Sequence, residues 1–173
     1  MHWIFGYGSL IWRPDFPYRQ ARKAVLRGWQ RRFWQASPDH RGVPAAPGRV
    51  VTIVEQREAL CWGMAFEIAA AEWLPIIAML DEREKNGYRP SQVSLDFDDG
   101  SSVTALTYIA GPDNPSFVGP APPAEMAAQI AQSHGPSGSN LDYLLRLADT
   151  LETLGIHDEE VLLLQKSLTH LER

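Results

Sequence analysis

Residues 88–109 read YRPSQVSLDFDDGSSVTALTYI and predict a β-hairpin. Two stretches that suit strands, residues 88–97 and 102–109, flank the turn sequence Asp98-Asp99-Gly100. An Asp-Gly pair between two such stretches is among the strongest short-range signals for a hairpin. The sequence therefore places two antiparallel strands just past the middle of the chain.

The residues before this hairpin also favour strands. Residues 3–7 are apolar and end at Gly8-Ser9, which is typical of a short buried strand followed by a turn. Residues 22–35 predict one or two strands, and residues 49–55 and 60–68 predict a strand pair. Residues 36–48 are expected to form a long loop, a kind of segment that is often functional in a compact domain. A helix is expected from Ala71 to about Glu84.

Helices are expected to follow the hairpin. Residues 111–123 are rich in Pro and Gly and predict a loop. Helices are then predicted over residues 124–133, from Ser139 to about Leu154, and over residues 158–171. Ser139 and Asp142 match a capping box, and Gly155 ends the second of these helices. The order of elements predicts an α+β fold, in which a small mixed sheet or β-barrel carries flanking helices and residues 1–173 form a single domain.

Composition agrees with a globular protein of 173 residues, with 45% hydrophobic and 21% charged residues. We expect no contact with a membrane, because no apolar run approaches the ~18 residues of a transmembrane helix. The N-terminal residues lack the pattern of a secretory signal. A single cysteine fits a reducing compartment, so the expected location is cytoplasmic.

Charge is unevenly distributed along the chain. Residues 1–60 carry ten Lys or Arg and four Asp or Glu, although the whole chain has a net charge of -5. A basic first third could attract a small anion, or it could be an ordinary solvated surface. Arg31-Arg32-Phe33-Trp34 interleaves basic and aromatic residues as binders of single-stranded nucleic acid do, but core aromatics with arginines at a sheet edge explain it better. We expect no nucleic acid partner.

The sequence Gly6-Tyr7-Gly8-Ser9 follows the first predicted strand. It is not a dinucleotide fingerprint, because the third glycine of that motif would fall at Ile11. Its backbone N–H groups are little shielded by side chains and could bind a carboxylate or stabilise an oxyanion. A plain tight turn is the alternative.

Three further groups are weaker candidates. Residues 135–140 open a helix and could bind an anion, although a helix cap and connector explains them better. Cys61 lies in a strand-like stretch and is expected to be a buried apolar residue rather than a nucleophile. The five histidines lack the spacing of metal ligands, so we expect no metal.

Residues 80–88 form a charged cluster at the end of the predicted helix. Asp81 and Glu84 share a helix face, and the apolar Leu80 and Tyr88 suggest partial burial. A carboxylate in a partly apolar pocket has a raised pKa and is a useful base. Glu84 is therefore a candidate general base, and a solvated helix end is the alternative.

Taken together, these segments resemble the ChaC family of glutathione-specific γ-glutamylcyclotransferases. The first matching stretch is Phe5-Gly6-Tyr7-Gly8-Ser9-Leu10-Ile11-Trp12. The others, in the order of the family, lie in residues 31–35, 39–44, 47–52, 80–88, 114–115, 119–122 and 135–144. The resemblance implies a small β-barrel with flanking helices, no cofactor, and cleavage of glutathione to 5-oxoproline and cysteinylglycine.

The resemblance also implies roles for particular residues. Glu84 would be the general base, and the γ-glutamyl group would be held by Phe5, Gly6, Tyr7, Gly8, Ser9 and Leu10. A proton-carrying Glu84 is expected to face a cavity lined by aromatic residues, with Tyr7 and Tyr143 among them. Arg41 and Arg49 are candidates for holding the cysteinylglycine end of the substrate.

Two other functions stay open at this point. A related cyclotransferase acting on other γ-glutamyl amides or amino acids would use the same residues. A non-catalytic binding module of the same fold is the third possibility, and the presence of Glu84 argues against it.

Overall fold

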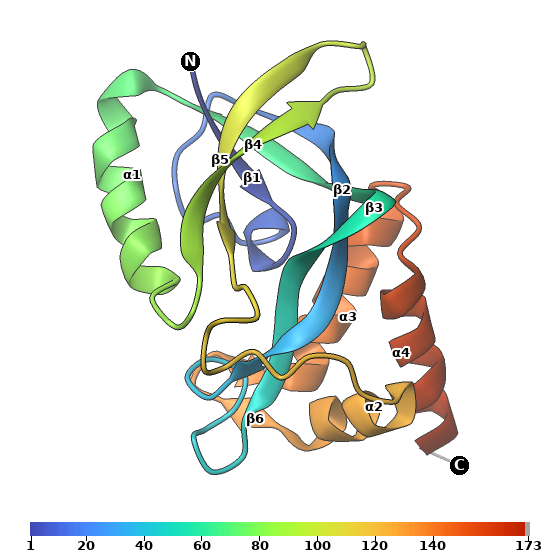
Figure 1. Cartoon of the computed structure of the whole chain (residues 1–173). Helices are drawn as coiled ribbons and strands as arrows, with labels where there is room; N and C mark the ends of the chain where they lie inside the picture. The colour runs from blue at the N-terminus through green and yellow to red at the C-terminus, as the bar shows by residue number, and fades with distance from the viewer. Residues whose placement is uncertain (172–173) are drawn as a thin grey trace.

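Two long strands form a curved antiparallel ribbon that organises this computed structural model, which describes residues 1–171 (Figure 1). Strand β2 (Gln20–Ser37) pairs with β3 (Gly48–Ile68) from Gln20 opposite Glu67 to Ser37 opposite Gly48. The register shifts between Arg27 and Trp29, where Gly28 has a φ of 82°. Such an irregularity bends a strand and increases its twist.

The strand pair predicted for residues 49–55 and 60–68 is wrong. These residues lie end to end in the single strand β3, and both halves pair with β2. The misleading signal is the exposed polar segment around Gln56, Arg57 and Glu58, which bulges opposite Gly28 without turning the chain back. The loop expected over residues 36–48 is correspondingly shorter, because Ala36, Ser37 and Gly48 belong to the two strands.

Three further strands close the ribbon into a barrel in the order β1-β3-β2-β4-β5. Strand β1 (His2–Gly6) is antiparallel to β3, and β4 (Arg89–Asp96) and β5 (Ser102–Ile109) form the predicted hairpin. The closing pair, Ile4 of β1 with Leu106 of β5, is parallel. The barrel is therefore mixed, and the predicted α+β fold is confirmed.

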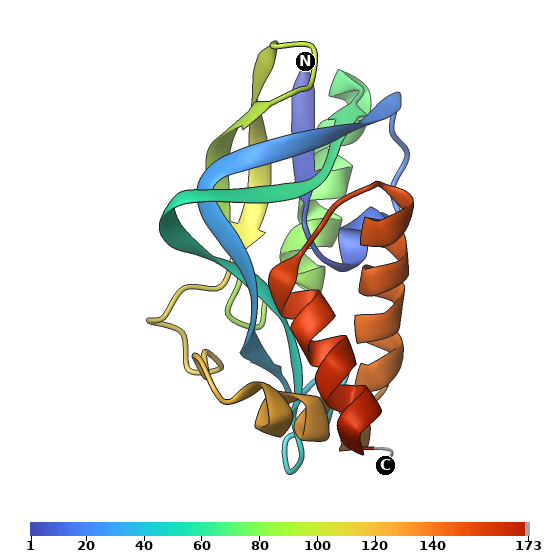
Figure 2. The ribbon, with the colours of Figure 1, turned by 90° about the vertical axis from the view of Figure 1, so that its right-hand side faces the viewer.

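Helices cover two sides of the barrel (Figures 1 and 2). Helix α1 (Ala70–Arg83) lies on one side, and α2 (Pro123–Gln132), α3 (Asn140–Thr153) and α4 (Glu159–Leu171) lie together on the other. The predicted cap is present, because the Ser139 hydroxyl accepts a hydrogen bond of 3.0 Å from the Asp142 amide. Two-residue strands β6 (His134–Gly135) and β7 (Gly138–Ser139) join α2 to α3.

Two hydrophobic clusters stabilise this arrangement. The larger joins the barrel to helices α2, α3 and α4, and it includes Phe5, Phe33 and the fully buried Leu144. The smaller joins β1 to α1 through residues such as Ile4 and Leu80. Cys61 is buried as expected.

Arg31 does not lie at an exposed sheet edge as predicted. Its residue is 3% exposed, and its guanidinium donates to the carbonyl of Tyr7, the carbonyl of Trp62 and the Asp158 carboxylate. This arginine is thus a buried structural link between the first turn and the start of α4.

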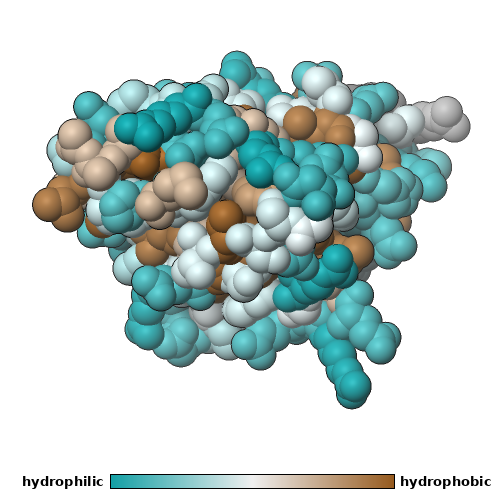
Figure 3. Space-filling model, turned by 90° about the horizontal axis from the view of Figure 1, so that it is seen from above, coloured by the Kyte–Doolittle hydropathy of each residue, from teal (hydrophilic) through white to brown (hydrophobic). Residues whose placement is uncertain are grey.

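Hydrophobic residues on the face shown in Figure 3 form small patches among hydrophilic ones. Within residues 1–171 every helix is too short or too polar to cross a membrane.

Candidate active site

The Gly8-Ser9 turn lies where β1 passes into a 3-10 turn, Ser9–Ile11. A side chain at Gly8 would approach Val51 Cγ2 to 2.9 Å and the Tyr143 hydroxyl to 3.1 Å. The glycine thus lets the backbone lie directly against Tyr143. Gly6 serves the fold, because a Cβ there would lie 2.7 Å from Cβ of Leu10.

The C-terminal end of α1 is tied to this turn. Arg83 Nη2 donates to the Ser9 hydroxyl at 2.8 Å, and its Nη1 donates to the Arg13 carbonyl at 3.1 Å. Glu84 follows directly as the C-cap of α1, where its amide donates to the Leu80 carbonyl at 2.8 Å. Two segments 75 positions apart in the sequence thus meet at one site.

An inner cavity lies at this meeting point. Glu84 lines it together with the predicted residues Phe5, Tyr7, Gly8, Ser9, Leu10 and Tyr143. The tyrosine hydroxyls are fixed by the backbone. Tyr7 donates to the Tyr108 carbonyl, Tyr88 donates to the Val51 carbonyl at 2.7 Å, and Tyr143 accepts from the Val51 amide at 3.2 Å. The cavity is therefore aromatic and rigidly held.

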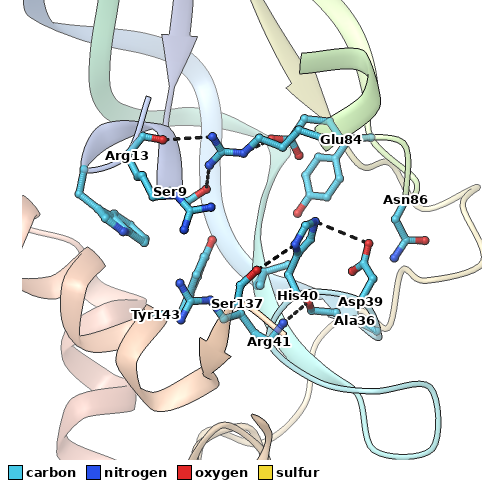
Figure 4. Close-up of a pocket in the computed structure, with 15 residues that line it drawn as sticks. Ser9, Arg13, Ala36, Asp39, His40, Arg41, Glu84, Asn86, Ser137 and Tyr143 are labelled. Carbon is cyan, nitrogen blue, oxygen red and sulfur yellow. Dashed lines mark hydrogen bonds and ion pairs between the residues drawn. The ribbon is translucent and has the colours of Figure 1, made fainter. Parts of the chain in front are cut away.

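An outer cavity adjoins the inner one (Figure 4). The two share Ser9, Glu84, Tyr88 and Tyr143. The outer cavity has more ionisable side chains in its walls, which include Arg13, Asp39, His40, Arg41 and Ser137. In Figure 4, Glu84 lies on one wall, with His40, Ser137 and Arg41 on the opposite side.

Burial controls the acidity of the groups in this site. The side chain of Glu84 is 19% exposed, and this burial raises the pKa of its carboxyl group. The Arg83 guanidinium, 3.7 Å away, and His40 partly oppose that shift. Burial also raises the pKa of Tyr143 to about 12, so that this hydroxyl keeps its proton.

Of the two arginines predicted to hold the substrate, only Arg41 lies at the site. Arg49 is wrong as a candidate. Its guanidinium donates to Gln129 Oε1 and to the carbonyls of Phe33 and Gly119, outside both cavities. These bonds use a basic residue to join β3 to α2 and to the loop before it.

The sequence analysis assigned no role to His40, Arg83, Tyr88 or Ser137. The structure brings all four to the outer cavity. Only their positions in the sequence could have indicated a role, because His40 lies in the long loop and Arg83 directly precedes Glu84. Within residues 1–171, His, Cys, Asp and Glu side chains form no cluster of three that could hold a metal ion.

Comparison with solved structures identifies the fold. The crystal structure of a yeast γ-glutamyl cyclotransferase specific to glutathione has a TM-score of 0.92 at 30% identity, and the match covers 98% of this chain and 96% of that one. A solved γ-glutamyl cyclotransferase that is 18% identical has a TM-score of 0.53 and shares the fold. The fold is therefore that of the γ-glutamylcyclotransferases.

Sequence comparison defines the family more closely. The model of the ChaC-like protein family matches residues 2–171. Glutathione-specific γ-glutamylcyclotransferase 1 of Mus musculus is 45% identical over 157 residues, covering 88% of this chain and 70% of that protein. γ-Glutamylcyclotransferase 2-3 of Arabidopsis thaliana is 38% identical over 98% of this chain and 89% of that protein. The chain belongs to the ChaC-like protein family.

Proposed function

We propose that this protein is a glutathione-specific γ-glutamylcyclotransferase that cleaves glutathione to 5-oxoproline and cysteinylglycine. Glu84 carries the proton in this reaction. The relatives named for this activity support the substrate, and the match to the yeast enzyme extends over nearly the whole of both chains.

The position of Glu84 is the observation that carries the proposal. Glu84 lines both the inner cavity, which is rich in tyrosines, and the outer cavity, which is rich in ionisable side chains. A γ-glutamyl group in the inner cavity and a dipeptide in the outer one would place the bond between them beside this carboxylate. The γ-glutamyl group would then be surrounded by Phe5, Tyr7, Gly8, Ser9, Leu10 and Tyr143. Gly6 would set the shape of the turn.

The reaction needs no external nucleophile. The α-amine of the glutamyl residue attacks its own γ-carbonyl carbon, a five-membered ring closes, and the bond to the cysteine nitrogen breaks. Holding the glutamyl chain folded is proximity catalysis, which is worth up to ~7–11 kcal/mol in well-oriented cases. The first amides of a helical turn have no acceptor within that turn. Those of Ser9 and Leu10 are thus available to the oxyanion.

The α-ammonium group loses two protons as its nitrogen becomes the ring amide, and the departing nitrogen gains two as it becomes the ammonium group of cysteinylglycine. Glu84 carries one of these protons, and solvent exchanges the other. An ordinary glutamate is a poor carrier, since transfer from an α-ammonium group to it is uphill by roughly 5 kcal/mol. Burial of Glu84 raises the pKa of its carboxyl group and so reduces this gap. The same protonated carboxyl group then donates to the leaving nitrogen, which returns Glu84 to its starting state.

The test is a product assay on the native protein and on Glu84→Gln, which keeps the size of the side chain but removes the proton carrier. Incubation with reduced glutathione should give 5-oxoproline and cysteinylglycine in a one-to-one ratio. We expect the variant to lose about 10²- to 10⁴-fold in kcat, the usual contribution of a general acid-base group. Glu82→Gln is the matched control, because Glu82 is an exposed neighbour of the site that pairs with Lys85.

Two outcomes would contradict the proposal in different ways. An inactive native protein that also fails on γ-glutamyl amino acids would leave only a binding role. Equal activity of native protein and Glu84→Gln would keep the reaction and reject Glu84 as the proton carrier.

A further inference from the structure

The outer cavity contains more arginines than the proposed proton transfer needs. Arg13, Arg41 and Arg83 all line it, together with His40, Asp39 and Glu84. On the proposed function, this cavity receives cysteinylglycine, whose free end is the carboxylate of glycine. The question is which cation is available to that carboxylate.

Two of the arginines, Arg13 and Arg83, share Asp15 as a carboxylate partner. Arg83 donates to Ser9 and to the Arg13 carbonyl, and it also lies near the carboxylates of Asp15 and Glu84. Arg13 pairs with Asp15 at 3.0 Å, and both side chains are about half exposed, a setting in which an ion pair contributes little to binding or stability.

Arg41 is held differently. Its side chain is 7% exposed, its amide donates to the Ser37 hydroxyl, and its guanidinium lies over the Tyr143 ring, 5.5 Å from the ring centre. Nη1 donates to the Ser139 carbonyl at 3.1 Å and to Asp142 Oδ2 at 3.3 Å. The guanidinium is thus fixed in place by contacts at one of its nitrogens and at its face.

The other two nitrogens of this guanidinium remain available. Within residues 1–171, neither Nε nor Nη2 of Arg41 donates a hydrogen bond. Neither atom is fully buried, because Trp3 Nε1 is the one buried side-chain atom in these residues that lacks a partner. Nε and Nη2 therefore reach solvent, and the solvent-filled space that Arg41 lines is the outer cavity. An arginine edge with two parallel N–H donors matches a carboxylate.

The charge around Arg41 also favours an anion. Asp142 is its nearest carboxylate, and that same oxygen Oδ2 accepts from Arg146 at 2.9 Å. One negative charge is thus shared between two guanidinium groups. A mostly buried arginine with only part of a counterion favours a further negative charge beside it.

We propose that Arg41 binds the glycine carboxylate of glutathione and so selects a dipeptide leaving group. This inference rests on the proposed function and names the residue that distinguishes glutathione from shorter γ-glutamyl compounds. Arg41 holds the end of the substrate remote from the scissile bond, with Glu84 on the opposite wall (Figure 4).

The first test uses the native protein and changes only the substrate. Glutathione would be compared with glutathione esterified at the glycine carboxyl and with γ-glutamylcysteine, which lacks glycine. We expect kcat/KM to fall about 10- to 100-fold for both analogues, the effect of losing a hydrogen-bonded charge. Absence of glutathione turnover would contradict the proposed function. Turnover of glutathione without any preference over the two analogues would contradict only carboxylate recognition.

The second test uses Arg41→Met and Arg41→Lys on the same three substrates. Arg41→Met should lower kcat/KM for glutathione about 10- to 100-fold and leave the ester and γ-glutamylcysteine at their native values. Arg41→Lys should recover part of the loss, since it restores the charge without the fork of donors. Arg146→Met is the control, because Arg146 shares Asp142 but is exposed outside the cavity.

The outcomes separate recognition from a structural role. If kcat/KM of the native protein is the same for the ester and for glutathione, recognition of the glycine carboxylate is rejected. If Arg41→Met lowers kcat/KM equally for all three substrates, Arg41 supports the shape of the site and does not bind the carboxylate. Loss of folding in Arg41→Met, measured as a lower Tm, leaves the substrate comparison on native protein to decide.

Discussion

Arg83 and Glu84 are adjacent in the sequence, and the pair shows how one neighbour adjusts the chemistry of another. Burial raises the pKa of the Glu84 carboxyl group, and the Arg83 guanidinium opposes that shift. In Arg83→Met the opposing charge is gone, so the pKa of Glu84 rises further. A base works only when deprotonated, and we therefore expect the acidic limb of the kcat/KM profile to move to higher pH.

A pH-rate profile of Arg83→Met against native protein measures this shift. Lys85→Met is the matched control, because Lys85 also adjoins Glu84 in sequence but is solvent-exposed and pairs with Glu82. A limb that stays at its native pH in Arg83→Met would show that another group controls it.

At this scale the sequence predicted that the glycine turn and Glu84 belong to one site, but it did not predict the residues around them. The glycine turn and Glu84 carry recognisable local patterns, and both line one cavity. His40 and Ser137 meet across 97 positions through a contact of 3.2 Å between Nδ1 and the hydroxyl. Such a contact depends on how the loops pack, and neither local sequence contains that information.

Among the elements, α4 is attached to the barrel by two acidic residues, the half-buried Asp158 just before the helix and the buried Glu160 within it. Asp158 binds Arg31, and Glu160 Oε2 accepts from the Phe33 amide at 2.7 Å. Burial raises the pKa of Glu160 to about 7, above its ordinary value near 4.5. Because the folded state holds this proton more tightly, the resulting stability is fully present below about pH 4.5 and is lost as pH rises through about 7.

The expected size of this effect is about 3 kcal/mol between those pH limits. Glu160→Gln cannot ionise, so the free energy of unfolding should fall less in this variant than in native protein between pH 5 and pH 8. Denaturant titrations at both pH values measure the difference. Glu159→Gln, on the exposed face of the same turn, should keep the native dependence.

The helices and the hairpin were predicted well because their signals are local. The Ser139 cap, the glycine after α3 and the Asp-Gly turn each act within a few residues. Strand β3 was split wrongly because its exposed segment near Glu58 has the polar composition of a turn. Only pairing with β2 on both sides of Gly28 keeps the strand continuous, and that pairing is a long-range property.

For the whole molecule, closure of the barrel depends on a short seam. Strands β1 and β5 pair at Ile4 and Leu106, and side chains add to this junction. The Thr107 hydroxyl donates to the Phe5 carbonyl at 2.9 Å, and the Tyr7 hydroxyl donates to the Tyr108 carbonyl. The four residues that these two hydrogen bonds join also line the inner cavity.

Thr107→Val keeps the shape of the side chain and removes one of these bonds. We expect the free energy of unfolding to fall by about 1–3 kcal/mol, because a buried carbonyl loses its partner. Thr104→Val, exposed on the same strand, should change it by less than about 0.5 kcal/mol. If urea titrations show the same change in the free energy of unfolding for both substitutions, the hydrogen bond of Thr107 does not stabilise the closure of the barrel.

The ribbon of β2 and β3 has one more consequence. Its far end, from Ser37 to Gly48, carries the loop with Asp39, His40 and Arg41, whereas Glu84 and the glycine turn come from other parts of the chain. One wall that would meet the departing dipeptide is therefore a loop at the end of the strand pair, which stops at Ser37 and Gly48. This loop is anchored to the segment before α3, because the Ser137 amide donates to the His40 carbonyl and Arg41 donates to the Ser139 carbonyl. The contacts to the leaving group would therefore depend on two loops that approach each other, whereas the contacts to the γ-glutamyl group would depend on a strand end and a helix end.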